Sequence, residues 1–253
     1  RLAQESLHNP ILKKYMLENQ TWLKLIQEEA LEPELPICDP HHHLWEHPKS
    51  RYLLEEYLED TGSGHNIVSS VFVECLSEYS TNLPKSLAPT GETKFVQELA
   101  VKNKNETAVA AGIVSFADML LGDSVEEVLE AHMATSPNRF KGIRHACGWD
   151  ASKLIRNSHT HPPRSLYQNK VFRRGFAKLS RYNLTFDAWL YHPQLGDLLS
   201  LARCFPEQPI ILDHIGGPLG IGPYKEKRKE IFQAWKKKIR ELAKCDNVLV
   251  KLG

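Results

Sequence analysis

The sequence lacks a long hydrophobic run and has almost no excess of either charge. Lys and Arg outnumber Asp and Glu by only one among 253 residues, so the formal net charge is +1. No apolar stretch approaches the roughly 20 residues of a membrane-spanning helix, and residues 1–20 lack the apolar core of a secretory signal. These absences argue against membrane insertion and general nucleic-acid binding. We therefore expect a small-molecule substrate as the partner, and a homo-oligomer is compatible with this composition.

Nucleotide-binding and disulfide patterns are also missing. Neither GxxxxGK[ST] nor GxGxxG occurs, and the turn at Gly216 and Gly217 is only a weak candidate for a phosphate loop. The five cysteines are an odd number and form no CxxC pair. Such scattered thiols are typical of a reducing compartment, which predicts a cytoplasmic location.

What the sequence does contain is a repeated alternation of short apolar runs and amphipathic stretches. The predicted strands lie at residues 35–38, 67–73, 108–115, 140–144, 184–190, 209–212 and 247–252. Nearly continuous apolar strands that alternate with helices predict a parallel sheet, covered on both faces. Their spacing favours an α/β fold of the (β/α)8 TIM-barrel type over an open sheet. An eighth strand would lie beyond Gly253, so we expect this chain to be part of a longer protein.

Two segments stand apart from this alternation. Residues 1–34 are predicted to be an N-terminal helical extension, because Trp22, Leu23, Ile26 and Ala30 have helical spacing. Residues 35–253 would then form the barrel domain. Within it, the Pro- and His-rich stretch 150–165 is too long for a simple connection and is a candidate lid, from which His159 or His161 could reach a site.

Polar and ionisable residues recur where the predicted strands end. In chain order they are Asp39, His41, His43, Glu74, Arg144, His145, Asp187, Tyr191, His192, Asp213, His214 and Lys251. Active sites of such barrels lie at the carboxyl ends of the strands. Burying so many charged or imidazole groups would cost roughly 2–7 kcal/mol each unless they were paired. The set therefore predicts a catalytic or binding site.

Some members of this set have other interpretations. In an extended segment His41 and His43 share one face, whereas His42 would point away and pack. Asp39 could bond local backbone or orient a histidine. The pair Tyr191 and His192 could cap the following helix.

Two further members could lie away from the site. Asp213 could face away from the pocket and leave His214 inside. Lys251 could bind nearby carbonyl groups instead of acting on a substrate.

Seven motifs give the chain a family resemblance. They are DPHHHLW at 39–45, VFVEC at 71–75, GETKFV at 91–96, GIRH at 142–145, FDAWLYHPQL at 186–195, LDHIGGP at 212–218 and NVLVKLG at 247–253. In this order they resemble the amidohydrolase superfamily, and within it the amidohydrolase-related, lactonase-like branch. Members of that branch open lactone rings in sugar or aromatic catabolism.

The resemblance implies a role for each matching residue. It implies His41, His43 and His214 as metal ligands, with His214 alternatively polarising the substrate. It implies that Arg144 and His192 contact a substrate carboxylate or carbonyl. We predict that Glu74, His192 and His214 are catalytic and that Arg144, His145, Asp187 and Tyr191 bind the substrate.

Two departures from the superfamily pattern concern the metal. The acid that usually follows strand eight would lie beyond Gly253, and Gly142, Ile143 and Arg144 stand where binuclear members carry a bridging lysine. A binuclear site is therefore disfavoured. One divalent metal, zinc or manganese, and a metal-independent reaction both remain open.

The resemblance leads to a functional expectation. We expect a hydrolase that opens a small polar lactone when water attacks a polarised carbonyl. A metal-dependent decarboxylase of an aromatic acid and a non-catalytic, truncated barrel are the alternatives.

Overall fold

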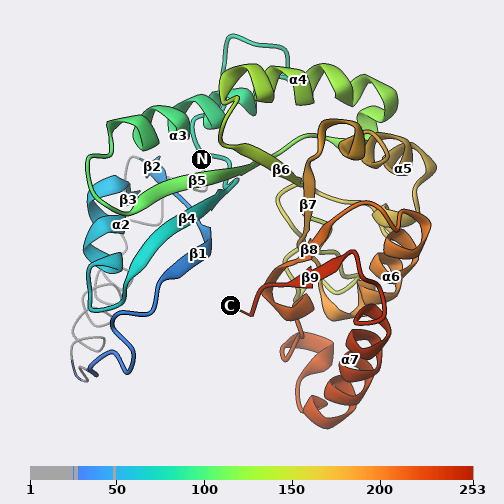
Figure 1. Ribbon diagram of the computed structural model, residues 1–253. Helices are drawn as coiled ribbons and strands as arrows, with labels where there is room; N and C mark the ends of the chain where they lie inside the picture. Colours follow the sequence, from blue (N-terminus) through green and yellow to red (C-terminus); the bar gives the residue numbers. More distant parts are fainter. Residues whose placement is uncertain (1–24, 26–27, 48–49, 253) are drawn as a thin grey trace.

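The central feature of the fold is a curled sheet of seven parallel strands (Figure 1). The computed structural model describes residues 25, 28–47 and 50–252. In spatial order, which is also chain order, the strands are β1 (Ile37–His42), β4 (Ile67–Val73), β5 (Ala108–Ser115), β6 (Phe140–Arg144), β7 (Thr185–Ala188), β8 (Ile210–Leu212) and β9 (Val248–Val250). The predicted parallel sheet of the barrel class is confirmed, since each strand pairs in parallel with the next one along the chain.

Helices follow the strands and lie outside the curled sheet (Figure 1). The α-helices are α2 (Leu54–Thr61), α3 (Thr90–Lys102), α4 (Val125–Thr135), α5 (Lys170–Phe176), α6 (Leu195–Cys204) and α7 (Arg228–Leu242). Short 3-10 helices are η1 (Met119–Ser124), η2 (Leu166–Gln168), η3 (Leu179–Tyr182), η4 (His192–Gln194), η5 (Asp213–Gly216) and η6 (Gly222–Tyr224).

The central strands are stabilised because most of their side chains are buried. Phe72, Ile113, Ile143 and Phe186 are fully buried in four neighbouring strands. Such burial stabilises the fold by roughly 1.5–3 kcal/mol for each large apolar side chain. Close strand contact also requires a glycine in β6, since a Cβ at Gly142 would lie 2.3 Å from the Thr185 hydroxyl oxygen.

Local structure departs from the sequence prediction at three places. The first strand was predicted at residues 35–38, but β1 runs from Ile37 to His42 and has an irregular register after Asp39. The short hairpin of β2 (Trp45–His47) and β3 (Ser50–Tyr52), and α2 after it, were not predicted. Ser124 with Glu127 three residues on is a capping-box pattern and predicts the start of a helix. Helix α4 does begin after Ser124, but the Ser124 side chain forms no capping hydrogen bond, so the predicted capping box is wrong.

The predicted N-terminal helical extension lies mostly outside the described residues. Its described part, residues 28–34, contains only bends, turns and irregular chain. Among the helices that the structure describes, none combines the length and hydropathy needed to cross a bilayer.

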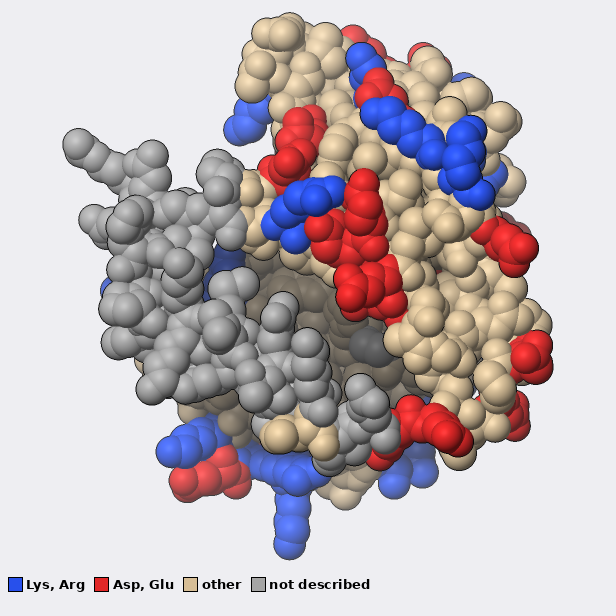
Figure 2. Space-filling view, turned by 90° about the vertical axis from the view of Figure 1, so that its left-hand side faces the viewer, with Lys and Arg blue, Asp and Glu red and all other residues tan. Residues whose placement is uncertain are grey.

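The curl of the sheet brings its two edge strands together at one end. Lys251 follows β9, and its Nζ lies 3.4 Å from Nδ1 of His41 in β1, although 210 positions separate them in the chain. Figure 2 shows a hollow in the face that forms the left-hand side of Figure 1, with Asp and Glu side chains gathered beside it. The carboxyl ends of the strands therefore meet in one place, as the barrel prediction requires.

Candidate active site

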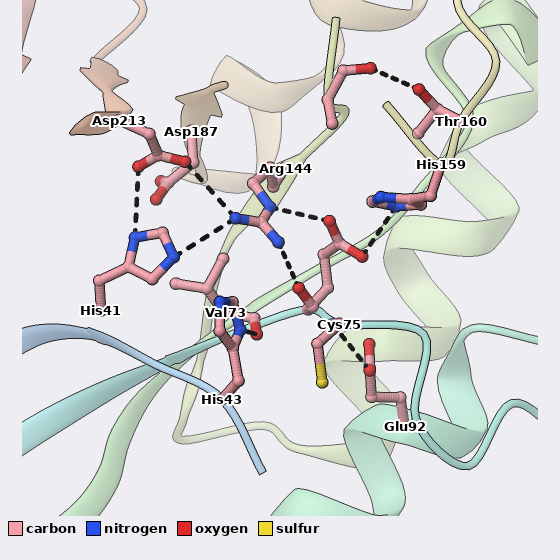
Figure 3. Close-up of polar contacts among 12 residues, drawn as sticks. His41, His43, Val73, Cys75, Glu92, Arg144, His159, Thr160, Asp187 and Asp213 are labelled. Atoms are coloured by element: carbon pink, nitrogen blue, oxygen red, sulfur yellow. Dashed lines mark hydrogen bonds and ion pairs between the residues drawn. The ribbon is translucent and has the colours of Figure 1, made fainter. Parts of the chain in front are cut away.

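An arginine–glutamate pair, Arg144 and Glu74, lies at the strand ends, and Figure 3 shows Arg144 between Asp213 and His159. Arg144, the last residue of β6, donates from Nε to Oε1 of Glu74 at 2.8 Å and from Nη2 to the Glu74 carbonyl oxygen. The Glu74 side chain is fully buried and that of Arg144 is only 9% exposed. Burial alone would raise the pKa of Glu74, but Arg144 and His159 outweigh it and lower the pKa. Glu74 is thus held as a carboxylate.

Asp213 connects four strand ends. Its carboxylate lies 3.6 Å from Nδ1 of His41, 3.7 Å from Nη1 of Arg144 and 3.3 Å from Nζ of Lys251. Its side chain is fully buried. Burial would raise the pKa of Asp213, but His41, Lys251 and Arg144 together lower it to about 2. Asp213 is therefore ionised and holds the cations of the site in place.

A second carboxylate in the cluster has the opposite pKa shift. Asp187, in β7, accepts a hydrogen bond from Nζ of Lys251 at 2.5 Å. Burial, and then repulsion from Asp213, raise the pKa of Asp187 to about 6. Two neighbouring carboxyl groups with pKa values pushed apart are typical of sites that transfer protons.

The contacts of His43 show which of its ring nitrogens carries the proton, whereas His41 lies between two cations. Burial lowers the pKa of both, to about 4 for His43. Nδ1 of His43 lies 2.7 Å from the Val73 carbonyl oxygen, so it carries the proton and Nε2 has a lone pair. Arg144 Nη1 and Lys251 Nζ lie 3.3 and 3.4 Å from Nε2 and Nδ1 of His41, so each ring nitrogen of His41 faces a cationic donor.

His214 also lies in this cluster, because the chain turns sharply after β8. His214 and Ile215 both adopt left-handed backbone conformations, with φ of 49° and 51°. The His214 ring centroid lies 4.7 Å from that of His41. The turn therefore brings the side chains of both Asp213 and His214 close to His41.

The three histidines were predicted to hold a metal, but their surroundings do not fit one. A zinc–nitrogen bond is about 2.0–2.1 Å long. The Arg144 Nη1 and Lys251 Nζ atoms lie 3.3 and 3.4 Å from the two ring nitrogens of His41, so a metal bound there would meet a fixed cation. In the described ranges, no three His, Cys, Asp or Glu side chains converge closely enough to hold an ion.

Three predicted site residues make other contacts. His145 is buried between Phe116 and Phe172, and its Nδ1 accepts a hydrogen bond from the Met119 amide at 3.2 Å. The Tyr191 hydroxyl donates to the Arg156 carbonyl oxygen at 2.5 Å.

His192 accepts a hydrogen bond at Nδ1 from the Leu219 amide, at 3.2 Å, and its ring packs edge-on against Tyr224. These contacts join Tyr191 and His192 to the surrounding loops.

Other contacts of the strand-end residues agree with their packing alternatives. His42 stacks on Tyr57 with ring centroids 4.3 Å apart, so it packs as expected. Asp39 accepts a hydrogen bond from the His41 amide at 3.1 Å. It therefore bonds local backbone.

Asp213 and Lys251 were named from the sequence among the strand-end residues, but neither was given a catalytic, metal-binding or substrate-binding role. Strict strand alternation would put Asp213 and His214 on opposite faces. The left-handed turn removes that alternation, and only the closing of β9 toward β1 brings Lys251 to His41. The position of both residues directly at predicted strand ends was the signal that could have found them.

Comparison with known proteins places the chain in a family. The sequence model of the amidohydrolase family matches residues 38–253, so the chain belongs to the amidohydrolases. This agrees with the resemblance noted in the sequence.

Individual relatives are more distant. An uncharacterized protein of Sinorhizobium fredii is 30% identical over 244 residues, which cover 87% of this chain and 73% of that protein. The L-fucono-1,5-lactonase of Burkholderia ambifaria is 27% identical over 173 residues, 68% of this chain and 51% of the lactonase. An amidohydrolase of Burkholderia multivorans, crystallised with bound zinc, is 22% identical, with a TM-score of 0.62 and coverage of 85% of this chain and 68% of that chain. The structural likeness supports the fold.

Proposed function

We propose that the protein hydrolyses the ester bond of a small, uncharged, hydroxylated lactone without a metal ion. The observation that carries this proposal is the buried cluster around Asp213, in which two cations and an unusually basic carboxylate meet at the strand ends. Membership of a hydrolase family and the distant likeness to a sugar lactonase support it.

The carbonyl oxygen would be polarised by Arg144. A guanidinium has five N–H groups, and the contacts of Arg144 with Glu74 and His41 use three of them. The remaining N–H groups can stabilise the negative charge that develops on the oxygen. Prearranged donors in a buried site are typically worth 10²–10³-fold in rate.

The attacking water would be deprotonated by Asp187. Its pKa of about 6 makes it a stronger base than an ordinary aspartate while it remains mostly ionised at neutral pH. Glu74 is the weaker candidate, because Arg144 and His159 both contact its carboxylate and lower its pKa. Ring opening forms the C–O bond to water, breaks the ring C–O bond, and returns the proton from Asp187 to the alkoxide.

The charge of the site favours an uncharged substrate. Glu74, Asp187 and Asp213 carry three negative charges against the two positive charges of Arg144 and Lys251, while burial keeps His41 and His43 neutral. A carboxylate on the substrate would add repulsion. Hydroxyl groups, by contrast, can donate to these carboxylates.

The test is a panel of lactones assayed by proton release. Uncharged sugar lactones are compared with lactones of the same ring size that bear a carboxylate, before and after chelation. We expect turnover of the uncharged series that survives chelation and that falls by roughly 10²–10⁴-fold in Asp187→Asn. The exposed Asp246→Asn is the matched control.

Each other outcome has a definite meaning. No opening of any lactone would refute the proposed hydrolysis. Preference for carboxylate lactones would refute the charge argument. Lactone turnover that is lost on chelation and restored by zinc would support His41, His43 and His214 as metal ligands. Metal-dependent release of CO2 from aromatic acids would instead favour a decarboxylase.

A further inference from the structure

A long loop delivers one imidazole to the buried glutamate of the site. Nε2 of His159 lies 3.3 Å from Oε2 of Glu74, whose side chain is fully buried, whereas that of His159 is 25% exposed. The other oxygen, Oε1, accepts the hydrogen bond from Nε of Arg144. One carboxylate oxygen of Glu74 thus contacts Arg144, at the end of β6, and the other contacts His159, in the loop; Figure 3 shows these contacts as dashed lines.

The loop is anchored on both sides of His159. The Ser158 amide and hydroxyl both donate to the Gly148 carbonyl oxygen, at 2.8 and 3.0 Å. The Thr160 hydroxyl donates to the Ala146 carbonyl oxygen at 2.5 Å. Because both neighbours of His159 are bonded to the chain just after β6, the imidazole is held over Glu74.

The rest of the loop is fastened to other elements. The Tyr191 hydroxyl bonds the Arg156 carbonyl oxygen, and the Tyr224 hydroxyl donates to Asp150 at 2.6 Å. At Gly148 a Cβ would lie 2.3 Å from the ring of Trp189, the residue after β7, so the loop approaches this ring as closely as a glycine allows. These contacts hold the loop closed over the site.

From this geometry we infer that His159 is a positioning residue of the proposed hydrolase. By holding Oε2, it fixes the rotation of the Glu74 carboxylate, and Glu74 in turn orients Arg144 toward His41 and Asp213. Closure of the 148–165 loop then completes the catalytic arrangement. The kinetic test of this inference rests on the proposed function. The positioning of Glu74 and Arg144 by His159 can be tested without a substrate.

The kinetic test compares four variants on the lactone that the wild-type protein opens best. His159→Phe keeps an aromatic ring without a hydrogen-bond donor, and His159→Gln keeps an N–H donor. His161→Asn is the matched loop control, since His161 is exposed and its φ of 48° suits asparagine. Thr160→Val removes the loop anchor without removing the imidazole.

We expect His159→Phe to lower kcat by roughly 10- to 100-fold, the effect of removing the polar partner of a buried charged group, with little change in KM. His159→Gln should recover most of that loss, and His161→Asn should behave as wild type. A smaller fall in Thr160→Val would fit a loosened loop. Equal losses in His159→Gln and His159→Phe, or no loss in either, would overturn the inference.

A second measurement needs no activity. The Nε–H resonance of Arg144, identified by its absence in Arg144→Lys, should exchange slowly with solvent and should keep this protection in His159→Gln. In His159→Phe it should shift and exchange at least roughly tenfold faster. An unchanged Arg144 resonance in His159→Phe would contradict the positioning role of His159. If the resonance changes but the protein opens no lactone, the positioning role stands and only the proposed reaction is refuted.

Discussion

The raised pKa of Asp187 predicts a specific dependence of stability on pH. Replacing Asp187 by Asn keeps the shape of the side chain and removes its titration. In the wild type, the pKa rises from 3.8 to about 6 on folding, because of burial and repulsion from Asp213. The folded state therefore binds a proton more tightly than the unfolded state does, so this contribution is complete below about pH 4 and is lost as pH rises through 6.

The magnitude follows from the size of the shift. Each pKa unit corresponds to about 1.4 kcal/mol, so a shift of about two units gives on the order of 3 kcal/mol. Asp187 is only 1% exposed, so screening by solvent reduces this little. Asp213, with a pKa of about 2, stays ionised in the folded state throughout this pH range, and its contribution is common to wild type and Asp187→Asn.

The assay is urea unfolding of wild type, Asp187→Asn and the exposed control Asp246→Asn at half-unit steps from pH 4 to pH 7. The free energy of unfolding of wild type minus that of Asp187→Asn should fall by about 3 kcal/mol across this range. The corresponding difference for Asp246→Asn should not show this fall. Parallel pH profiles for wild type and Asp187→Asn would refute the assignment of a raised pKa to this carboxyl group.

Other predictions concern the rest of the cluster. Asp213→Asn should destabilise the protein by roughly 3–5 kcal/mol in urea unfolding, because it leaves buried cations without their partner; a change below about 1 kcal/mol would contradict the buried network. Arg144→Met should lower kcat for lactone opening by roughly 10²–10³-fold, and wild-type kinetics would remove its role. Gly148→Ala should cost roughly 1–3 kcal/mol through its clash with the Trp189 ring, and an unchanged melting curve would show that the loop adjusts freely. Chelation should leave the kinetics of the wild type unchanged, and lost activity would argue for a bound metal.

Much of the fold could be predicted because strand burial leaves a local pattern. The runs at 67–73, 108–115 and 140–144 coincide with β4, β5 and β6, since strands covered on both faces are apolar throughout. The hairpin of β2 and β3 was missed because its polar residues, such as Glu46, His47 and Arg51, carry no such pattern.

The site was harder to predict than the fold. The residue types at strand ends indicated Arg144, Glu74 and His41, and the structure brings these three together. It places His145 in the apolar layer instead, because consecutive residues after β6 point to opposite sides. His159 could be named only as a candidate, since loop geometry is not encoded in a periodic pattern.

The sequence by itself determined the order of strands and helices, the family motifs and the set of ionisable residues at strand ends. These depend on local burial and on residue identity, which are visible along the chain. Only the tertiary structure decided which of those residues meet. The contact between His41 and Lys251 spans 210 positions, and the left-handed turn at His214 reorients Asp213. The shifted pKa values of Asp187 and Asp213 are caused by burial and by such long-range contacts. They therefore arise only when the sheet has curled.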